Sequence, residues 1–391
     1  IVVEKREVLK SWTILLAILA FGFSLIGTFI VRSGVITSVH SFASDLERGI
    51  FILAILAFFV GGALLLFSVR AGVMQAKGVF APVSREGALV LNNILLAVSA
   101  FVVFIGTVWP LVAEMAWDRK LSVGAPFFEK AFTPFMVALA LILPIGAILP
   151  WKRGKLMRAL HPLRGALIFA AAVMLLVFAV STGHSALAVI GAGLGSWLIA
   201  GAVAELWLRT GSSGWSRLGR LPRADWGKAL AHAGLGVTFI GVSLIMAWQV
   251  EDIRVARMGE TFNVAGYDIT LEGVEQRPGP NYDSVIATMN VAKDGRQIAV
   301  LYPEKRVYPV QSMPTTEAAI HNGLFRDIYL VIGDEQKEGG WAVRSYIKPF
   351  ASWIWLGCAL MALGGLVSLS DRRYRVAAGA RRAHGHAQPA E

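Results

Sequence analysis

The feature that most constrains this chain is a set of about eight apolar runs, each close to 20 residues long. The hydrocarbon core of a bilayer is about 30 Å thick, and a helix crosses it in roughly 20 residues. Backbone polar groups find no water there, so each run must be helical. The sequence therefore predicts a polytopic α-helical membrane protein in a lipid bilayer, with spans near residues 12–31, 49–69, 88–113, 131–149, 165–183, 185–204, 229–248 and 350–370.

Basic residues gather at alternate junctions between these runs. A net charge of +11 suggests a nucleic-acid partner in a soluble protein, but 55% of this chain is hydrophobic and its Lys and Arg lie at the ends of spans. Positive loops stay in the cytoplasm, so this pattern predicts both chain ends inside and no nucleic-acid partner. The basic junctions are residues 5–10, 70–85, 151–164, 209–228 and 371–382.

The segment before the last run has a different pattern. Apolar and polar residues alternate in it, and Asp294-Gly295 is a hairpin turn signal. We predict a membrane bundle over residues 1–248 and a small extracytoplasmic β domain over 249–348, inserted before the last helix. The last span then covers 349–371, and a basic cytoplasmic tail, predicted to be disordered, covers 372–391.

One histidine, His232, is the only ionisable side chain that the sequence places clearly inside a span. Such groups are costly in a bilayer and are candidates for function. Around it, Ala229, Ala233 and Gly236 form a face of small residues. Either a flat macrocycle lies against this face with the imidazole as its axial ligand, or a neighbouring helix packs there and His232 bonds a carbonyl.

Charged residues other than histidine lie outside the predicted spans. Glu114 and Glu205 fall at span ends, where we expect water to reach them. Ion-coupled transporters need charged groups within the membrane, so this distribution argues against that class. The single cysteine, Cys358, excludes an intrachain disulfide and a paired-cysteine metal site.

A second candidate, His40, lies in an outward loop rich in small polar residues. Neutral imidazole is a good iron ligand, and the flanking Arg32 and Arg48 suit carboxylates such as haem propionates. The alternative is that His40 caps a helix end in a re-entrant connection. The remaining histidines are expected to be solvated or to make only local hydrogen bonds: His161, His184, His321, His384 and His386.

Several stretches resemble the CcmF family, the large haem lyase subunit of system I cytochrome c maturation. They are GTFIVRSGVITSVHSFASDLERGIFIL (27–53), NNILLAVSAFVVFIGTVWPL (92–111), FFEKAFTPFM (127–136), AHAGLGVTFIGVS (231–243) and the region from GLFRDIYLVIGD to WIWLGCALMALGG (323–365). The resemblance implies that His40 is a periplasmic ligand to the haem being transferred, which is a substrate. It implies that His232 binds a resident haem b.

The same resemblance implies a reaction and partners. Thiols of a CxxCH motif in apocytochrome c add to the haem vinyl groups, with CcmE as the haem carrier and CcmH as the subunit that presents apocytochrome, at the periplasmic side of the bacterial inner membrane. The family's WWD segment and two partner histidines are absent from this sequence. We therefore expect a C-terminal portion, inactive without a missing N-terminal part. The competing hypothesis is a non-haem membrane scaffold or permease with a periplasmic docking domain.

Overall fold

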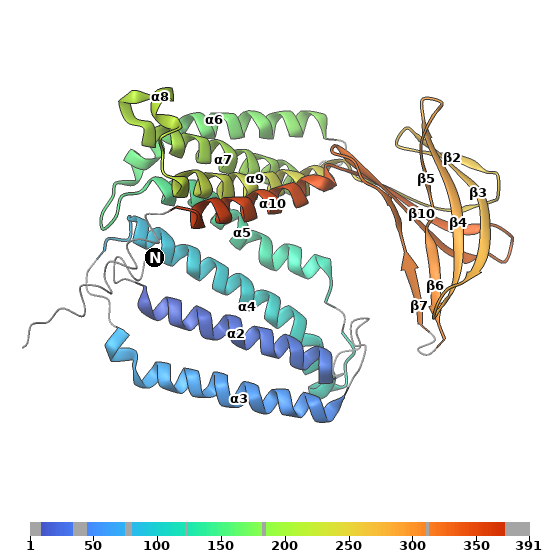
Figure 1. Cartoon of the computed structure of the whole chain (residues 1–391), viewed down its shortest axis with the longest axis horizontal. Coiled ribbons are helices and arrows are strands. Elements are labelled where there is room, and N and C mark those ends of the chain that lie inside the picture. Colours follow the sequence, from blue (N-terminus) through green and yellow to red (C-terminus); the bar gives the residue numbers. More distant parts are fainter. Residues whose placement is uncertain are drawn as a thin grey trace, which may run out of the picture. The chain divides into compact units, whose positions relative to one another are not determined.

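The computed structural model describes residues 9–33, 45–74, 80–121, 123–181, 185–309 and 313–371 of the 391 (Figure 1). Within these ranges, eight helices are long and apolar enough to cross a membrane. This confirms the predicted polytopic class. They are α2 (Lys10–Ser33), α3 (Leu46–Val69), α4 (Arg85–Trp117), α5 (Ala125–Ile148), α6 (Leu156–Val180), α7 (Ala186–Thr210), α9 (Arg223–Trp248) and α10 (Ala351–Leu369).

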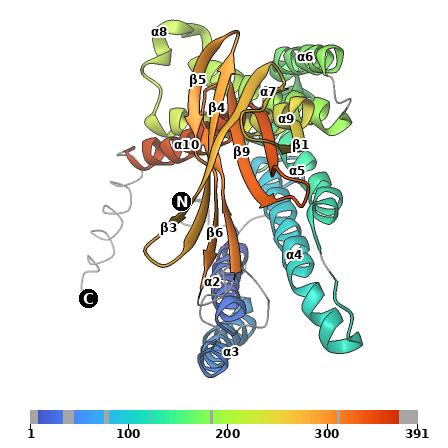
Figure 2. The same cartoon turned by 90° about the vertical axis from the view of Figure 1, so that its right-hand side faces the viewer.

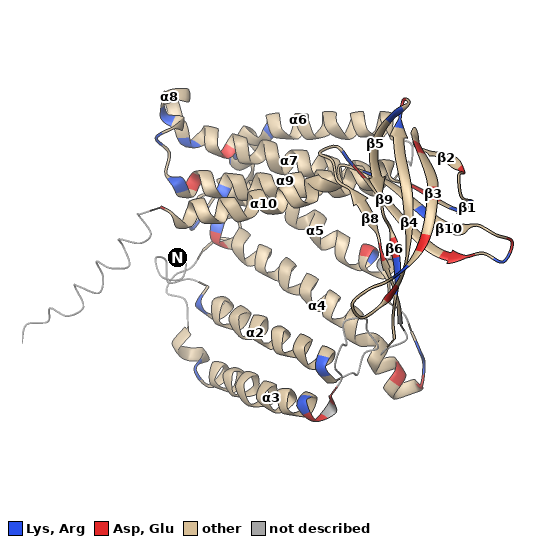
Figure 3. Cartoon of the chain, turned by 45° about the vertical axis from the view of Figure 1, so that its right-hand side comes forward, with Lys and Arg blue, Asp and Glu red and all other residues tan. Residues whose placement is uncertain are grey.

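Several helices extend beyond the apolar run that predicted them. α4 has 33 residues, and its first turn is capped by Ser84, whose Oγ accepts the Gly87 N–H at 3.0 Å. α6 begins at Leu156, so His161 lies in a helix and not in the predicted loop. Hydropathy marks only the part of a helix inside lipid, whereas caps and further backbone hydrogen bonds carry the helix past it. Figure 3 shows the result: the middles of the helices are free of charge, and Lys, Arg, Asp and Glu lie at their ends.

The chain divides into two compact units, with the boundary between His161 and Pro162. In the first unit α2 packs against α3 and α4 packs against α5. Glycines permit these contacts: a Cβ added to Gly106 of α4 would lie 2.6 Å from the ring of Phe127 in α5. A short 3-10 helix, η1 (Ala71–Met74), follows α3.

The second unit contains α6, α7, α9 and α10 together with the β domain. α9 packs against α7 on one side and against α10 on another, and the three helices run side by side in Figure 1. A small core of Val177, Ala192 and Leu244 ties α6, α7 and α9 together. Two short helical turns, η2 (Gly211–Ser213) and α8 (Trp215–Leu218), connect α7 to α9.

The β domain consists of two antiparallel sheets (Figure 2). One has the strand order β1-β10-β9-β8, and the other has the order β2-β3-β4-β6-β7 with β5 also paired to β4. Alternate residues of both sheets are fully buried, among them Ile269, Met289 and Leu330. The strands are β1 (Val250–Ala256), β2 (Thr261–Val264), β3 (Tyr267–Pro278), β4 (Asp283–Lys293), β5 (Arg296–Leu301), β6 (Glu304–Tyr308), β7 (Met313–Glu317), β8 (Ala319–His321), β9 (Arg326–Glu335) and β10 (Trp341–Pro349).

Two tight hairpins set strand register in this domain. The predicted Asp294-Gly295 turn is confirmed: both residues have positive φ, at 51° and 74°, and they join β4 to β5. Ala265-Gly266 makes the same kind of turn between β2 and β3, with φ values of 50° and 82°. Alanine is rarely found in this conformation, so the residue at the first turn position does not mark the second hairpin.

The junction between the β domain and the membrane helices is very short. Gln249 alone separates α9 from β1, and Phe350 alone separates β10 from α10. The two strands pair with each other, with Val250 opposite Ile347. The packed pair of helices therefore continues directly into a paired couple of strands.

Candidate functional site

α9 carries the candidate ligand His232, and its packing against α10 fixes where that residue stands. Gly227, Gly234 and Gly241 recur every seven residues along α9 and meet the backbone of α10. A Cβ on Gly234 would lie 2.7 Å from the Gly357 carbonyl oxygen, closer than real Cβ contacts come. Backbones that approach this closely leave no freedom for either helix to turn about its axis.

At the first turn of α9, the end predicted to face the cytoplasm, a hydrogen bond joins α9 to the chain just after α10. Asp371, just after α10, is buried, and its Oδ2 accepts the Ala224 N–H at 3.0 Å. The first N–H groups of a helix have no partner within the helix, so this carboxylate acts as a cap supplied from another element.

α7 covers the neighbouring face of α9. A Cβ on Gly236 would lie 2.6 Å from the Gly195 carbonyl oxygen, and Gly191 meets Ser243 two turns further along. The small-residue face predicted around His232 is thus occupied by α7 at Gly236, which leaves no room for a macrocycle at that level. At the level of Gly236 this face therefore serves helix packing.

Four charged side chains join α7 to α9 close to His232. Arg209 Nη2 lies 3.0 Å from Glu205 Oε1, and Arg209 Nη1 lies 2.9 Å from Asp225 Oδ1. Lys228 Nζ also pairs with Glu205 Oε1. We call Glu205, Arg209, Asp225 and Lys228 the α7–α9 charge cluster.

The prediction that water reaches Glu205 is wrong. Its side chain is only 4% exposed, and its Oε2 is buried without a hydrogen-bond partner among the described residues. The error arises because α7 runs on to Thr210 and lies against α9, which supplies Lys228. Glu114, by contrast, is exposed, as predicted.

His232 lies one helical turn beyond Lys228 and one turn before Gly236, so it stands on the face of α9 that turns toward α7. The imidazole is partly buried, and Glu205 and Lys228 are the charged groups that act on it. Within the described ranges no hydrogen bond to this imidazole is formed, so the carbonyl bond of the packing interpretation is not made there. A histidine held on a rigid helix with its nitrogens unengaged fits an axial ligand to iron.

Comparison with known proteins decides the family. Residues 247–349 match the family model described as the CcmF C-terminal beta-sandwich. The chain is 67% identical over 383 residues to the cytochrome c-type biogenesis protein ccl1 of Rhodobacter capsulatus, a match covering 98% of this chain and 58% of that protein. A solved structure of the cytochrome c heme lyase CcmF matches with a TM-score of 0.69 and 25% identity, over 94% of this chain and 56% of that chain. The chain belongs to the CcmF family.

A further relative sets the extent of the match. The CycK protein of Bradyrhizobium diazoefficiens, another cytochrome c-type biogenesis protein, is 49% identical over 398 residues, which cover 100% of this chain and 60% of that protein. The chain therefore spans somewhat more than half the length of its CcmF-family relatives. The resemblance and the fold class drawn from the sequence are both confirmed.

The other candidate residues of this CcmF-family chain are less fully placed. His40 lies outside the described residues, as do His184, the two tail histidines and the predicted tail over 372–391. Arg48 pairs with Asp45, the N-cap residue of α3, at 3.1 Å, and its side chain is 68% exposed. The Arg32 carbonyl accepts the Asp45 N–H at 2.9 Å, so both arginines flank one helix start next to the His40 loop.

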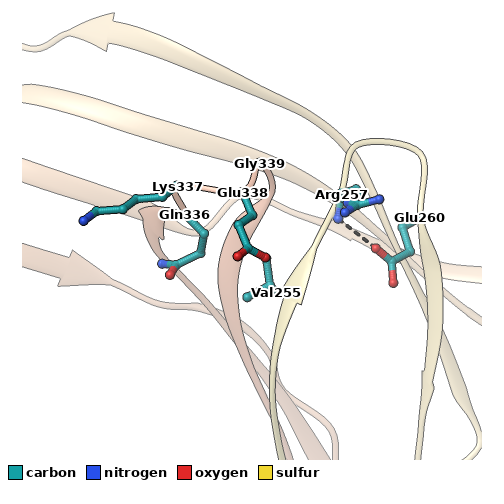
Figure 4. A pocket seen from close by; sticks show the side chains of 7 residues that line it. All are labelled: Val255, Arg257, Glu260, Gln336, Lys337, Glu338 and Gly339. Atoms are coloured by element: carbon teal, nitrogen blue, oxygen red, sulfur yellow. Dashed lines mark hydrogen bonds between the residues drawn. The ribbon is translucent and has the colours of Figure 1, made fainter.

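The β domain has no comparable constellation. Among the described residues no group of three or more His, Cys, Asp or Glu is arranged to hold a metal ion. A pocket between the β1–β2 and β9–β10 turns is lined mainly by mixed charges, and Glu260 Oε2 there accepts the backbone N–H of Arg257 at 2.8 Å (Figure 4). Nearby, a hydrogen bond from Arg254 holds the pKa of Asp252 below its ordinary value. The Asp252 carboxylate also forms an ion pair with Arg254. His321 lies partly buried in β8.

Replacement of Glu205 by alanine is expected to weaken the α7–α9 contact. Lys228 would lose its carboxylate, and Arg209 would keep only Asp225. We expect the free energy of unfolding in detergent to fall by about 3 kcal/mol, because removing one member of a buried ion pair leaves the partner charge uncompensated. Glu114→Ala, which removes an exposed carboxylate, is the control and should change unfolding little. Equal effects of the two changes would contradict a structural role for the cluster.

Proposed function

We propose that this chain is the haem-handling part of a haem lyase that attaches haem to the CxxCH thiols of apocytochrome c. The observation that carries the proposal is His232: an imidazole without a hydrogen-bond partner among the described residues, on a membrane helix of a CcmF-family chain. Its matching relatives are named as cytochrome c-type biogenesis proteins.

In this proposal His232 would hold the iron of a resident haem b, together with a second ligand from outside the described residues. A bound haem supplies reversible one-electron chemistry at its iron. The protein's part is to hold the imidazole at a fixed height in the membrane. The contacts of α9 with α10 and α7 do this, because glycine-to-backbone packing prevents the helix from sliding or turning.

A second imidazole, that of His40, would ligate the haem substrate on the opposite side of the membrane. Holding the haem still makes the attack of two thiols on its vinyl groups effectively intramolecular. Arg32 and Arg48 flank the loop and would pair with the propionates, for which Arg48 must share its guanidinium with Asp45. We propose CcmE as the haem carrier and CcmH as the subunit that presents apocytochrome c.

The orientation proposed is that of a bacterial inner-membrane protein with both ends in the cytoplasm and a periplasmic β domain. The distribution of charge supports it. The ends of α7 and α9 that meet at the charge cluster are rich in arginine and lysine, whereas the opposite end of α9 leads into the β domain. His232 is then nearer the cytoplasmic side.

A chimaera tests the role of His40. This chain replaces the matching part of the Rhodobacter capsulatus relative, and the product is expressed in a host that lacks its own CcmF. We expect His40→Ala to lower the yield of c-type cytochrome by at least about tenfold, since positioning of the reacting groups is lost. The b-type absorption of the chimaera should remain.

Ser38→Ala, in the same loop, is the matched control and should leave the yield of cytochrome unchanged. Normal haem attachment by the His40→Ala chimaera would contradict the assignment. If neither the parent chimaera nor its variants binds haem, the scaffold hypothesis is favoured instead.

A further inference from the structure

An exposed apolar pair lies at the base of the β domain. The loop that joins β8 to β9 is Asn322–Phe325, here called the β8–β9 loop, and its Leu324 and Phe325 are 59% and 61% exposed. Neither residue belongs to the buried core between the two sheets. Burying a side chain of this size is favourable by about 1.5–3 kcal/mol, so covering this adjacent pair would lower the free energy.

Three contacts attach this loop to the first turn of α10. The Phe350 N–H donates to the Phe325 carbonyl oxygen at 2.9 Å, and the two rings meet edge to face with centroids 5.9 Å apart. Asp327 Oδ1 accepts both the Gly323 N–H, at 3.0 Å, and the Ser352 hydroxyl, at 3.2 Å. The height of the loop is therefore set by the height of α10.

The length of α10 determines that height. Its 19 residues rise about 28 Å, which is no more than the thickness of the hydrocarbon core. Ala351, the first residue of α10, must accordingly lie at the edge of the apolar layer. The opposite end of α10 is fixed beside the start of α9 by the hydrogen bond between Asp371 and Ala224.

Aromatic residues mark the same boundary. Trp248, the last residue of α9, donates its Nε1–H to the Val180 carbonyl at the end of α6 at 3.1 Å. Trp353 packs its ring against Phe350. Tryptophan is enriched at membrane interfaces because it is apolar with one polar group, so Trp248 places the ends of α6 and α9 at the interface. Phe350, just before α10, packs against the same apolar cluster as Trp248, which puts the start of α10 at that level.

We propose that the β8–β9 loop inserts Leu324 and Phe325 into the lipid interface of the leaflet next to the β domain. The partner of this surface is phospholipid, whose acyl chains just below the headgroups would surround the two apolar side chains. The loop gives the β domain a third attachment to the membrane, beside the α9 and α10 junctions. The inference requires only that the chain spans a bilayer and is independent of haem.

A fluorescent probe measures the depth of the loop. In a Cys358→Ser background, Leu324→Cys is labelled with an environment-sensitive dye and the full chain is placed in phosphatidylcholine vesicles. We expect blue-shifted emission, and quenching by lipids with a nitroxide near the headgroup several-fold stronger than by aqueous iodide. Met258→Cys is the matched control. It is 66% exposed but lies beyond the far end of β1 from α9, so its probe should behave as in water.

Each outcome decides the proposal. Emission from position 324 that equals emission from position 258 overturns it. Water-like emission in vesicles that turns blue only when apocytochrome or another protein is added also overturns it, because the surface would then dock protein. Should Leu324→Cys fail to fold, Phe325→Cys gives the same measurement.

Discussion

His232→Ala in the ccl1 chimaera is expected to abolish its b-type absorption. The imidazole is the only proposed iron ligand on α9, and a neutral methyl group cannot replace it. The reduced-minus-oxidised spectrum measures the effect directly: the α-band of the parent should disappear. Added imidazole should restore part of it, because the shortened side chain leaves space for the free ligand.

The control separates loss of a ligand from loss of the fold. His321→Ala removes an imidazole from β8, where no role in haem binding is proposed, and should keep the full α-band. The His232→Ala protein should also keep its unfolding temperature within a few degrees. An unchanged spectrum in His232→Ala would refute haem ligation by this residue and favour packing as its role.

Gly364→Ala is expected to destabilise the protein far more than Gly365→Ala. These neighbours lie in the same helix, but a Cβ on Gly364 would sit 2.5 Å from the Gly227 carbonyl oxygen and 2.7 Å from the Ala231 nitrogen of α9. A Cβ on Gly365 would have no atom within 4 Å. Forcing the first methyl into the interface should cost about 1–3 kcal/mol.

The second substitution should be neutral or stabilising by up to about 1 kcal/mol, because alanine is the better helix former. Thermal unfolding in detergent compares the two variants, with the protein concentration and detergent held constant. Equal losses for both glycines would mean that α9 and α10 do not pack as described. Since both substitutions add the same methyl group, their difference reports only its surroundings.

Local chemistry determined which parts of the fold could be predicted. The spans follow from the length of apolar runs, and the β4–β5 hairpin follows from Asp294-Gly295, whose φ values match that turn. The extra length of α4 could not be seen, because its ends are fixed by a cap at Ser84 and not by hydropathy. From the sequence alone a carboxylate at a span end, such as Glu205, is predicted to be exposed to water. Its burial becomes evident only when the packing of a second helix against it is known.

The site shows the same division. The sequence is enough to single out His232 as a candidate, because an ionisable group inside a span is rare and this argument needs no tertiary information. The α7–α9 charge cluster was missed, although Glu205 and Arg209 stand four residues apart on one helix and so signal an ion pair. Its remaining members come from α9, and only the packing of Gly195 against Gly236 brings them into reach.

The one-residue junctions at Gln249 and Phe350 have a mechanical consequence. A domain on flexible linkers can swivel without disturbing what it is attached to. Here β1 and β10 are paired to each other and are continuous with α9 and α10. We therefore expect the β domain and this helix pair to move together as one rigid body. A force applied to the ends of β1 and β10 far from the helices would therefore twist α9, the helix that carries His232.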